Sequence, residues 1–446
     1  MRLATLALAP LAHAFVIPFE WEVRWATDAV ESVLDEKPTI WQLLNADDKY
    51  TRLVKILEFE GSIKKELDTD GHVTFFAPNN EALTPPKHDH DHDHDQDRHM
   101  DGPSLASITQ ALDEEPQLLD KDDGGDGGRK KRREMLRRFA RAVLQYHLLP
   151  DSHDIASLAR NSTMATCLVP HDGSADGLAR RIHIDKELLP PGVTINFYAR
   201  VRSSAGAANG HVHELAHPLF PPASIFDAMF FTTRWLSTST SAIQRVGGTK
   251  YLEWEYDRER SKPGKPVFKG TPLTTFFAPS NRAWNRLPRR LHAYLFSPFG
   301  RRALTRLLMY HAVPHTLVHA EIVHHVEHGE IVQADHGKHR DGVATVDSDE
   351  WRHAFEVHSA LGPKLSIVAE KKRLLPIDGA VVTCMSVNGV PVKGLDIVAS
   401  NGAWHVLDKV LCPPHAHPDA WAAAAPDADP WADWEEWLPA WAESTD

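Results

Sequence analysis

The chain has 446 residues, of which 42% are hydrophobic and 25% are charged, an ordinary composition for a globular protein. Its formal net charge of −12 argues against a nucleic-acid partner, because binding to phosphates requires a basic face. The 28 histidines would reverse the sign of this charge if all were protonated. We therefore expect surface charge and self-association to change between about pH 5 and 7.

The first residues have the pattern of a secretory signal peptide. Arg2 precedes the apolar run 3–11, and Ala12-His13-Ala14 supplies small residues for cleavage. The run is too short to span a membrane. We expect a signal peptide at residues 1–14, an entry segment at 15–37 and a secreted mature protein without a membrane span. The alternatives are a plain apolar N-terminus, and retention in the lumen of a secretory-pathway organelle.

Helices come first in each half of the chain and strands come later. Apolar spacing over residues 39–58 predicts helices, and residues 73–77 predict a strand. Asn79, and Ser280 in the second half, are expected to cap the helix that follows this strand. Residues 380–385, 395–399 and 404–411 predict strands, with a turn at Asn388-Gly389. The predicted class is α+β.

Residues 87–133 have no counterpart in the second half, and their polar, Gly-rich composition predicts a disordered insert. His88, His90, His92 and His94 alternate with aspartates in it. Imidazoles bind Zn²⁺, Cu²⁺ or Ni²⁺, so adventitious metal binding and a plain solvated loop both remain open. The basic run 129–133 is either a processing-protease site or the solvated start of the next helix.

Met135, Phe139 and Val143 recur at a spacing of four and predict an amphipathic helix that runs into Tyr146-His147. A second such helix is expected to run into Tyr310-His311. Each His is a candidate general base, but no Ser or Cys nucleophile recurs beside it. The alternative is a hydrogen-bonded structural histidine at a helix end. The later histidines are expected at the surface; they are His315, His319, His324, His325 and His328.

Three further predictions concern glycosylation, disulfide formation and the C-terminal tail. Asn161 begins the N-S-T sequon and is a predicted glycosylation site. Cys384 and Cys412 either form a disulfide or remain buried thiols, which leaves Cys167 over. The tail 415–446 is acidic and rich in tryptophan, and four of its tryptophans share one helical face. That face is expected to dock on the protein's own surface or on a partner.

Three blocks recur in the same order. T-F-F-A-P stands in residues 74–83 and 275–284, Arg-Arg to Tyr-His in 137–150 and 301–314, and Asn-Gly in 209–218 and 401–414. Such recurrence indicates a duplicated domain. We expect domain 1 at residues 38–220 and domain 2 at 221–414.

The three blocks resemble the fasciclin domain. That family carries T-x-F-A-P-x-N-x-A-F, a central Tyr-His, and N-G-x-x-H-x-(I/L)-D near its end. The second repeat matches all three, and its last block includes Asn401, Gly402 and His405. The last block of repeat one departs from the pattern. The resemblance implies two tandem β-wedge domains packed with α-helices, in an adhesion or matrix protein without enzymatic activity.

In animal members of the family, an Asp-Ile pair before the last Asn-Gly is associated with integrin-type adhesion. The corresponding pair here is Asp396-Ile397, and repeat one lacks it. The alternative is that Asp396 ends a turn and Ile397 belongs to the core.

We therefore expect a secreted, non-enzymatic adhesion protein without a cofactor. Its partner would be a cell-surface, matrix or cell-wall protein or a glycan. The alternative is a secreted metal- or small-ligand-binding protein that uses the His/Asp-rich insert.

Overall fold

The computed structural model describes residues 37–69, 71–84, 105–114, 127–188, 191–262, 265–327, 330–334, 350–373, 381–414 and 429–444. Pro38–Asp446 forms one compact unit. The predicted signal peptide at residues 1–14 and the histidines of the insert, His88, His90, His92 and His94, lie outside the described residues.

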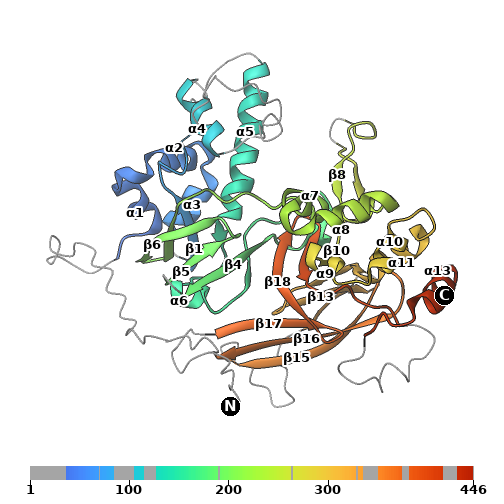
Figure 1. Cartoon of the computed structure of the whole chain (residues 1–446). Coiled ribbons are helices and arrows are strands. Elements are labelled where there is room, and N and C mark those ends of the chain that lie inside the picture. Colours follow the sequence, from blue (N-terminus) through green and yellow to red (C-terminus); the bar gives the residue numbers. More distant parts are fainter. Residues whose placement is uncertain are drawn as a thin grey trace, which may run out of the picture. The chain divides into compact units, whose positions relative to one another are not determined.

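Two seven-stranded sheets, one in each half of the chain, have the same order of strands. The first has the order β2-β1-β7-β6-β5-β4-β3, and the second has β11-β10-β19-β18-β17-β16-β15 (Figure 1). The strands of the first sheet are β1 (Val73–Pro78), β2 (Leu148–Leu149), β3 (Thr163–Ala165), β4 (Arg181–Leu188), β5 (Pro191–Ile195), β6 (Ala199–Ala207) and β7 (Gly210–Leu215). Those of the second sheet are β10 (Thr274–Pro279), β11 (Ala312–Pro314), β15 (Trp351–His358), β16 (Lys364–Arg373), β17 (Val381–Val387), β18 (Val390–Ala399) and β19 (Gly402–Leu407).

The strand that carries T-F-F-A-P lies inside each sheet and pairs in parallel with the last strand. Thus β1 pairs in parallel with β7, and β10 with β19, whereas the neighbouring strands pair antiparallel. Every residue of β1 and of β10 is buried, as is typical of a strand covered on both faces. The predicted α+β class is confirmed.

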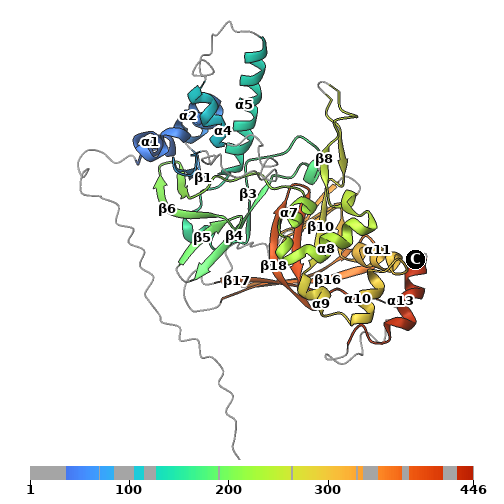
Figure 2. The ribbon, with the colours of Figure 1, turned by 45° about the horizontal axis from the view of Figure 1, so that its top comes forward.

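Helices cover the first sheet on one side (Figures 1 and 2). They are α1 (Ile40–Ala46), α2 (Thr51–Glu60), α3 (Ser62–Asp68), α4 (Leu105–Glu114) and α5 (Gly127–Tyr146). The α1 helix begins with a capping box, in which Thr39 and Gln42 each accept the other's backbone N–H. One buried apolar cluster joins these helices to Phe75 of β1.

Part of the predicted disordered insert is helical. Leu105, Ile108 and Leu112 of α4 are buried in the first core cluster. The prediction of disorder is therefore wrong for residues 105–114, because apolar spacings of three and four give this short segment a face that fits the core. The prediction is also wrong for residues 127–133, which are helical in α5 (Gly127–Tyr146). Residues 87–104 and 115–126 lie outside the described residues.

The α5 helix begins earlier than predicted and turns a different face inward. The basic run 129–133 lies in its first turns. Met135, predicted to face the core, is 61% exposed, and Leu136 is buried instead. The buried face follows Leu136, Ala140 and Val143, because spacings of four and three track a helix better than strict fours do.

Helices of the second half are α7 (Ile225–Phe231), α8 (Thr233–Val246), α9 (Asn281–Asn285), α10 (Arg289–Leu295) and α11 (Arg301–Tyr310). Ser280 caps α9 as predicted, since its side chain accepts from Ala283 N. Asn79 binds Ala82 N in the same way, but turns rather than a helix follow it. The predicted helix after Asn79 is therefore absent from the described residues 79–84.

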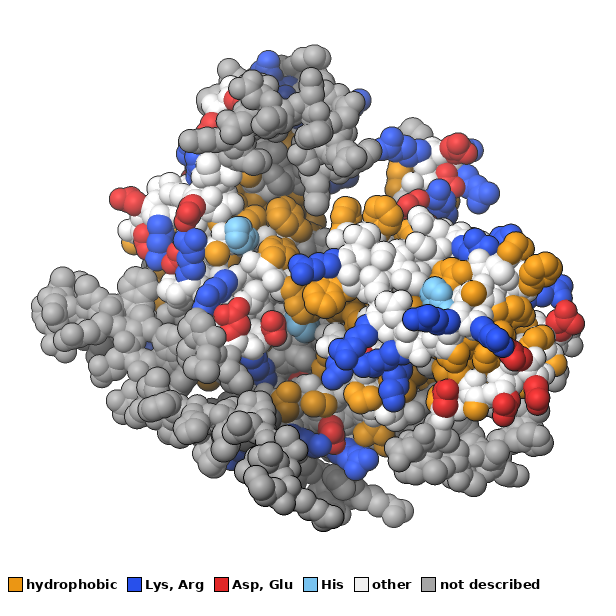
Figure 3. All heavy atoms as spheres, viewed as in Figure 1, with side chains coloured by type: hydrophobic (Ala, Val, Ile, Leu, Met, Phe, Trp, Pro, Cys, Tyr) orange, Lys and Arg blue, Asp and Glu red, His pale blue; other side chains and the backbone are white. Residues whose placement is uncertain are grey.

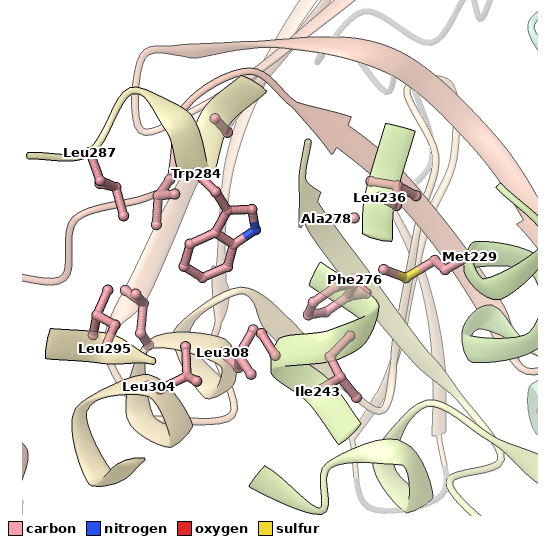
Figure 4. Packing of buried hydrophobic residues seen from close by; sticks show 14 of the residues in the cluster. Met229, Leu236, Ile243, Phe276, Ala278, Trp284, Leu287, Leu295, Leu304 and Leu308 are labelled. Atoms are coloured by element: carbon pink, nitrogen blue, oxygen red, sulfur yellow. The ribbon is translucent and has the colours of Figure 1, made fainter. Parts of the chain in front are cut away.

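Trp284 is the largest fully buried side chain of the protein's described residues (Figure 4). It packs in a second core cluster with Leu236, Leu295 and Leu304. Its indole N–H donates to the hydroxyl of Ser239 at 2.8 Å. Because the indole N–H is satisfied, the whole ring can be buried without an unpaired donor.

The tryptophan-rich tail packs on repeat two. The α13 helix (Trp434–Glu443) buries Leu438 and Ala442 in the second core cluster. The ring of Trp434 lies 5.3 Å from that of Tyr294, and the Arg306 guanidinium lies 4.9 Å from the Trp441 ring. Of the two predictions for this face, the structure shows docking on the protein's own surface.

Two small sheets accompany repeat two. One contains β12 (Thr316–Val318), β13 (Val323–Glu327) and β14 (Glu330–Ala334), and the other β8 (Trp254–Tyr256) and β9 (Phe268–Gly270). His319 and His324, predicted at the surface, are only 1% and 2% exposed because they lie in or beside this strand layer; His315 is exposed. The side chains of His325 and His328 lie outside the described ones.

The face of the protein seen in Figure 3 carries charges of both signs between hydrophobic side chains. No helix in the described part of the chain is both long and apolar enough to cross a membrane.

Gly402 and Gly210, the glycines of the two Asn-Gly pairs, allow the parallel strands to approach. Gly402 has φ +138°, and a Cβ there would lie 1.8 Å from Thr274 O. Gly210 has φ +142°, and its Cβ would lie 1.8 Å from Val73 O. A side chain at either position would force the parallel strands apart.

We expect Gly402→Ala to lower the free energy of unfolding by on the order of 3 kcal/mol, through the clash and the strained φ together. Gly389→Ala is the matched control, because Gly389 has φ +75° with no atom within 4 Å of its Cβ position. That substitution should cost about 1 kcal/mol. Urea unfolding measures both, and equal losses would contradict the close-approach argument.

Candidate functional site

The histidines of the two Tyr-His pairs have the same hydrogen bonds. His147 Nδ1 lies 2.8 Å from Val143 O, and its Nε2 accepts from Leu219 N at 2.9 Å. His311 Nδ1 lies 2.7 Å from Leu307 O, and its Nε2 accepts from a backbone N–H at 2.9 Å. Since Nε2 accepts, each ring is a neutral tautomer that donates through Nδ1. Burial lowers the pKa of each to about 4.

The tyrosines of these pairs are also used inside the fold. Tyr146 donates to Arg181 O at 3.0 Å and accepts from the Asn196 side chain at 2.9 Å. The hydroxyl of Tyr310 accepts from the Asn388 side chain at 2.8 Å. Burial raises the pKa of Tyr310 to about 12. The Tyr-His pairs therefore connect the end of a helix to the sheet in both repeats. All four of these side chains are buried.

The asparagines of the Asn-Gly pairs hold the first helix of each repeat. Asn401 Oδ1 accepts from Ile225 N at 3.0 Å, and its amide donates to Thr271 O at 3.1 Å. Asn209 Oδ1 likewise accepts from Ile40 N at 2.9 Å. Both asparagines are buried, so each satisfies a helix N-terminus that water does not reach.

Asp396 lies in a β-bulge of β18. The register passes from Gly394 opposite Val406 to Ile397 opposite Trp404, so two residues face the single His405. Asp396 has φ +55°, a conformation that Asp tolerates better than most residues. The bulge turns its side chain inward, where it is 0% exposed.

The carboxylate of Asp396 joins the two repeats. Its Oδ2 accepts from the Ser162 hydroxyl at 2.5 Å, and its Oδ1 accepts from Ala320 N at 2.8 Å. His183 Nδ1 lies 3.1 Å from the backbone oxygen of Asp396. Ser162 and His183 belong to repeat one, whereas Asp396 and Ala320 belong to repeat two.

Two more histidines of repeat two complete this group. His319 Nδ1 lies 3.5 Å from Asp396 Oδ1, and His405 Nδ1 lies 3.8 Å from the same oxygen. His405 Nδ1 accepts from Asp396 N at 3.0 Å, and its Nε2 donates to Val318 O at 2.9 Å. We call Ser162, His183, His319, Asp396 and His405 the Asp396 cluster.

Charge in the Asp396 cluster is set by burial and by close contacts. Burial alone would raise the pKa of Asp396, but its interactions with His319, His405 and Ser162 hold the pKa below its usual value. Burial lowers the pKa of His405 to about 4 and also lowers that of His319 and His183. At neutral pH the cluster therefore holds an ionised carboxylate among neutral imidazoles.

A second carboxylate, with a side chain that is 12% exposed, lies beside the cluster. Glu321 Oε2 accepts from Ser162 N at 3.1 Å, and its Oε1 lies 3.6 Å from Lys371 Nζ. Burial raises the pKa of Glu321. Arg181 is the other nearby cation; burial lowers its pKa to about 10, so it stays charged at neutral pH. Charged groups from both repeats thus meet away from water, where each needs a partner.

The structure brings some predicted site residues together and leaves others apart. Asp396 and His405 belong to one cluster, whereas His147 and His311 lie at separate helix ends. Ile397 is half-buried and packs against the second core cluster. The burial of Asp396 means that a partner could touch its carboxylate only if the repeats separated.

Ser162, His183 and His319 escaped prediction. The bulge makes β18 one residue longer than β6 against strands of equal length, a difference that the strand registers show. Nothing in the spacing linked it to Ser162, which lies 234 residues away.

Asn161, the predicted glycosylation site, is partly exposed, and its amide donates to Ser157 O at 3.2 Å. Cys167, Cys384 and Cys412 are free thiols, so of the two alternatives for Cys384 and Cys412 the structure shows unpaired thiols. Cys384 is exposed and Cys412 is buried; burial raises the pKa of Cys412. Burial raises the pKa of Cys167 to about 11, which keeps its thiol protonated. Among the described residues, no group of three or more His, Cys, Asp or Glu side chains is arranged to hold a metal ion.

Comparison with known protein families finds a match in repeat two. The fasciclin-domain family model matches residues 236–413, which contain β10, β19 and the Asp396 bulge. Residues 236–413 of this chain are therefore a fasciclin domain. The similar strand order of the first sheet gives repeat one the same topology.

The chain is similar to known proteins both in sequence and in structure. The "Aurofusarin biosynthesis cluster protein S" of Gibberella zeae is 28% identical over 246 residues, or 53% of this chain and 54% of that protein. The match thus spans about half the length of this relative. A FAS1 domain pair from the insect cell adhesion molecule fasciclin I is 15% identical and covers 81% of this chain and 97% of that one, with a TM-score of 0.30.

Buried histidines make stability depend on pH. His147, His213, His311 and His405 have pKa values of about 4, lowered mainly by burial, against about 6.5 in an unfolded chain. Below pH 6.5 the unfolded chain binds protons that the folded protein does not. The free energy of unfolding should therefore fall from about pH 6.5 towards 4, by on the order of 1–2 kcal/mol per site between pH 7 and 5.

Urea unfolding at several pH values measures this slope. His311→Gln removes one titrating site and should reduce the slope, although it lowers stability at pH 7. His72→Gln, at an exposed position, is the matched control and should leave the slope unchanged. Equal slopes for all three proteins would show that His311 is not kept neutral by the fold.

Proposed function

We propose that the protein is a non-enzymatic interaction protein that binds a cell-surface, matrix or cell-wall partner, either a protein or a glycan. The observation that carries this proposal is the fasciclin domain at residues 236–413. Repeat two is proposed as the binding unit, because its last motif block is the complete one. We propose an extracellular location on the same ground.

The hydrogen bonds of the motif histidines within the fold support a non-enzymatic role. Both nitrogens of His147 and of His311 are bound within the fold, so neither ring has a free lone pair to act as a base. His405 likewise accepts through one nitrogen and donates through the other. The recurring histidines are thus occupied in hydrogen bonds within their own repeats.

We propose that Asp396 acts in adhesion by positioning rather than by contact. Its carboxylate is buried and bound to Ser162 of repeat one, so it fixes how β18 meets that repeat. Ile397 follows on the same strand and is half-buried. A partner would then recognise the surface that this arrangement presents, and loss of the Asp396 charge would disturb it indirectly.

Retention of the purified full-length mature protein on isolated cell wall or matrix tests this function. We expect the wild type to be retained, and Asp396→Asn and Ser162→Ala to reduce both retention and thermal stability. A hydrogen bond to a charged group contributes roughly 1.5–3 kcal/mol, which sets the scale of the stability loss. Lys393→Ala is the matched control, because Lys393 is an exposed residue of the same strand.

Retention and thermal stability, measured together, distinguish direct contact by Asp396 from positioning. Loss of retention by Asp396→Asn without loss of stability would show direct contact and contradict positioning. No retention of folded wild-type protein on any wall or matrix preparation would reject the adhesion proposal.

The relative from Gibberella zeae suggests one kind of partner. That protein is named for the aurofusarin biosynthesis cluster. We propose that a partner of the present chain can be another protein of a biosynthetic assembly. Capture of the same protein from culture by the wild type, and not by Asp396→Asn, would support this.

The second candidate function is metal binding by the insert. His88, His90, His92 and His94 supply four imidazoles within seven residues, outside the described residues. We expect Zn²⁺ to release heat with the intact protein and much less heat with a variant that lacks residues 88–99. Replacing the four histidines by Asn keeps the aspartates and should lower the heat as the deletion does. Equal heats for all three would reject the metal site.

A further inference from the structure

A cavity of about 500 Å³ lies within repeat two, between α8, α11 and the start of β10. Buried Ile243, Phe276 and Leu308 line it, and Figure 4 shows these side chains close together. Tyr251 and Met309, which are 59% and 38% exposed, stand at its edge. Its volume is typical of a site for a small organic molecule.

The cavity exists because repeat two lacks a helix that repeat one has. The helices α2 and α8 both end at a left-handed glycine, Gly61 and Gly247. After Gly61, α3 buries Ile63 and Leu67 in the core. After Gly247 comes only the short 3-10 helix η5 (Thr249–Tyr251), which buries no residue, and then the β8–β9 hairpin. The space beside β10 is left partly unfilled.

One extra residue of repeat two also borders the cavity. In repeat one Thr74 donates to Asp151 O, four residues after the His of its Tyr-His pair. In repeat two the equivalent Thr275 donates to Thr316 O, five residues after that His. The added residue is His315, which has φ +53° and lines the cavity. A non-glycine residue in this conformation is strained, and such strain gathers at binding sites.

The lining determines the chemistry of the occupant. No Asp, Glu, Lys or Arg is among the described residues that line the cavity, so a buried charge on a ligand would have no opposite charge there. The polar groups near its edge include the Tyr251 hydroxyl and the His315 ring, and neither makes a hydrogen bond to another described residue. Lys250 is outside the lining, with its Nζ 5.0 Å from the Tyr251 ring centre.

We propose that this cavity binds an uncharged aromatic small molecule, with its ring system against Phe276 and Leu308 and a hydroxyl or carbonyl group at Tyr251 and His315. Flat rings suit the apolar inner end, and a neutral oxygen suits the donors and acceptors at the edge. This role goes beyond the proposed adhesion and does not depend on it, because the lining residues all lie within repeat two.

Equilibrium dialysis of the full-length mature protein against naphthol tests the proposal, with naphthalene sulfonate as the charged probe of the same ring system. We expect saturable binding of naphthol and at least tenfold weaker binding of the sulfonate. Thr305→Phe, which places a ring in the cavity from α11, should weaken naphthol binding at least tenfold. Tyr251→Phe removes one hydroxyl and should weaken it about fivefold.

Tyr256→Phe is the matched control, because Tyr256 is an exposed tyrosine outside the lining. It should leave naphthol binding unchanged. Thermal unfolding checks that each variant is folded. If Thr305→Phe is not folded, the result for the surface variant Tyr251→Phe decides the test. Absence of naphthol binding, equal binding by wild type and Tyr251→Phe, or equal affinity for the sulfonate would overturn the proposal.

Discussion

The parallel pairing of the last strand with the T-F-F-A-P strand is the contact on which each repeat depends. It joins β1 to β7 and β10 to β19, strands that are more than a hundred residues apart. Gly210 and Gly402 let the strands approach, and the asparagine before each glycine binds the first helix of its repeat. One turn thus closes the sheet and anchors the beginning of the domain to its end.

The repeats differ in the segments that connect the shared helices and strands, because the parallel pairing does not constrain the length or structure of those segments. Repeat one carries α4 and the His/Asp-rich insert between β1 and α5, whereas repeat two has the β8–β9 hairpin in place of α3. The extra residue in the β18 bulge and the extra His315 are also confined to repeat two. Long surface insertions cost a folded domain little, so such segments can change while the core stays the same.

The sequence was sufficient for what is local or repeated. The T-F-F-A-P strands, the Ser280 cap and the turn at Asn388-Gly389 follow from short patterns, and the structure contains all three. The helix at residues 105–114 was missed because the polar residues around it dominate the composition. Burial of His319 and the contact of Ser162 with Asp396 depend on how two distant segments meet. No periodicity within one segment carries that information.

Burial of the Asp396 carboxylate constrains what repeat two can do. A charge inside a protein is costly unless it is paired and hydrogen-bonded, and here Ser162, Ala320 and the neighbouring imidazoles provide those contacts. Ser162 comes from repeat one, so separating the repeats would leave the carboxylate without one of its two hydrogen-bond donors. We infer that the Asp396 cluster specifies the arrangement of the two domains more than it adds to their stability. Recognition by repeat two would then depend on its contact with repeat one, whereas the cavity beside β10 lies within repeat two.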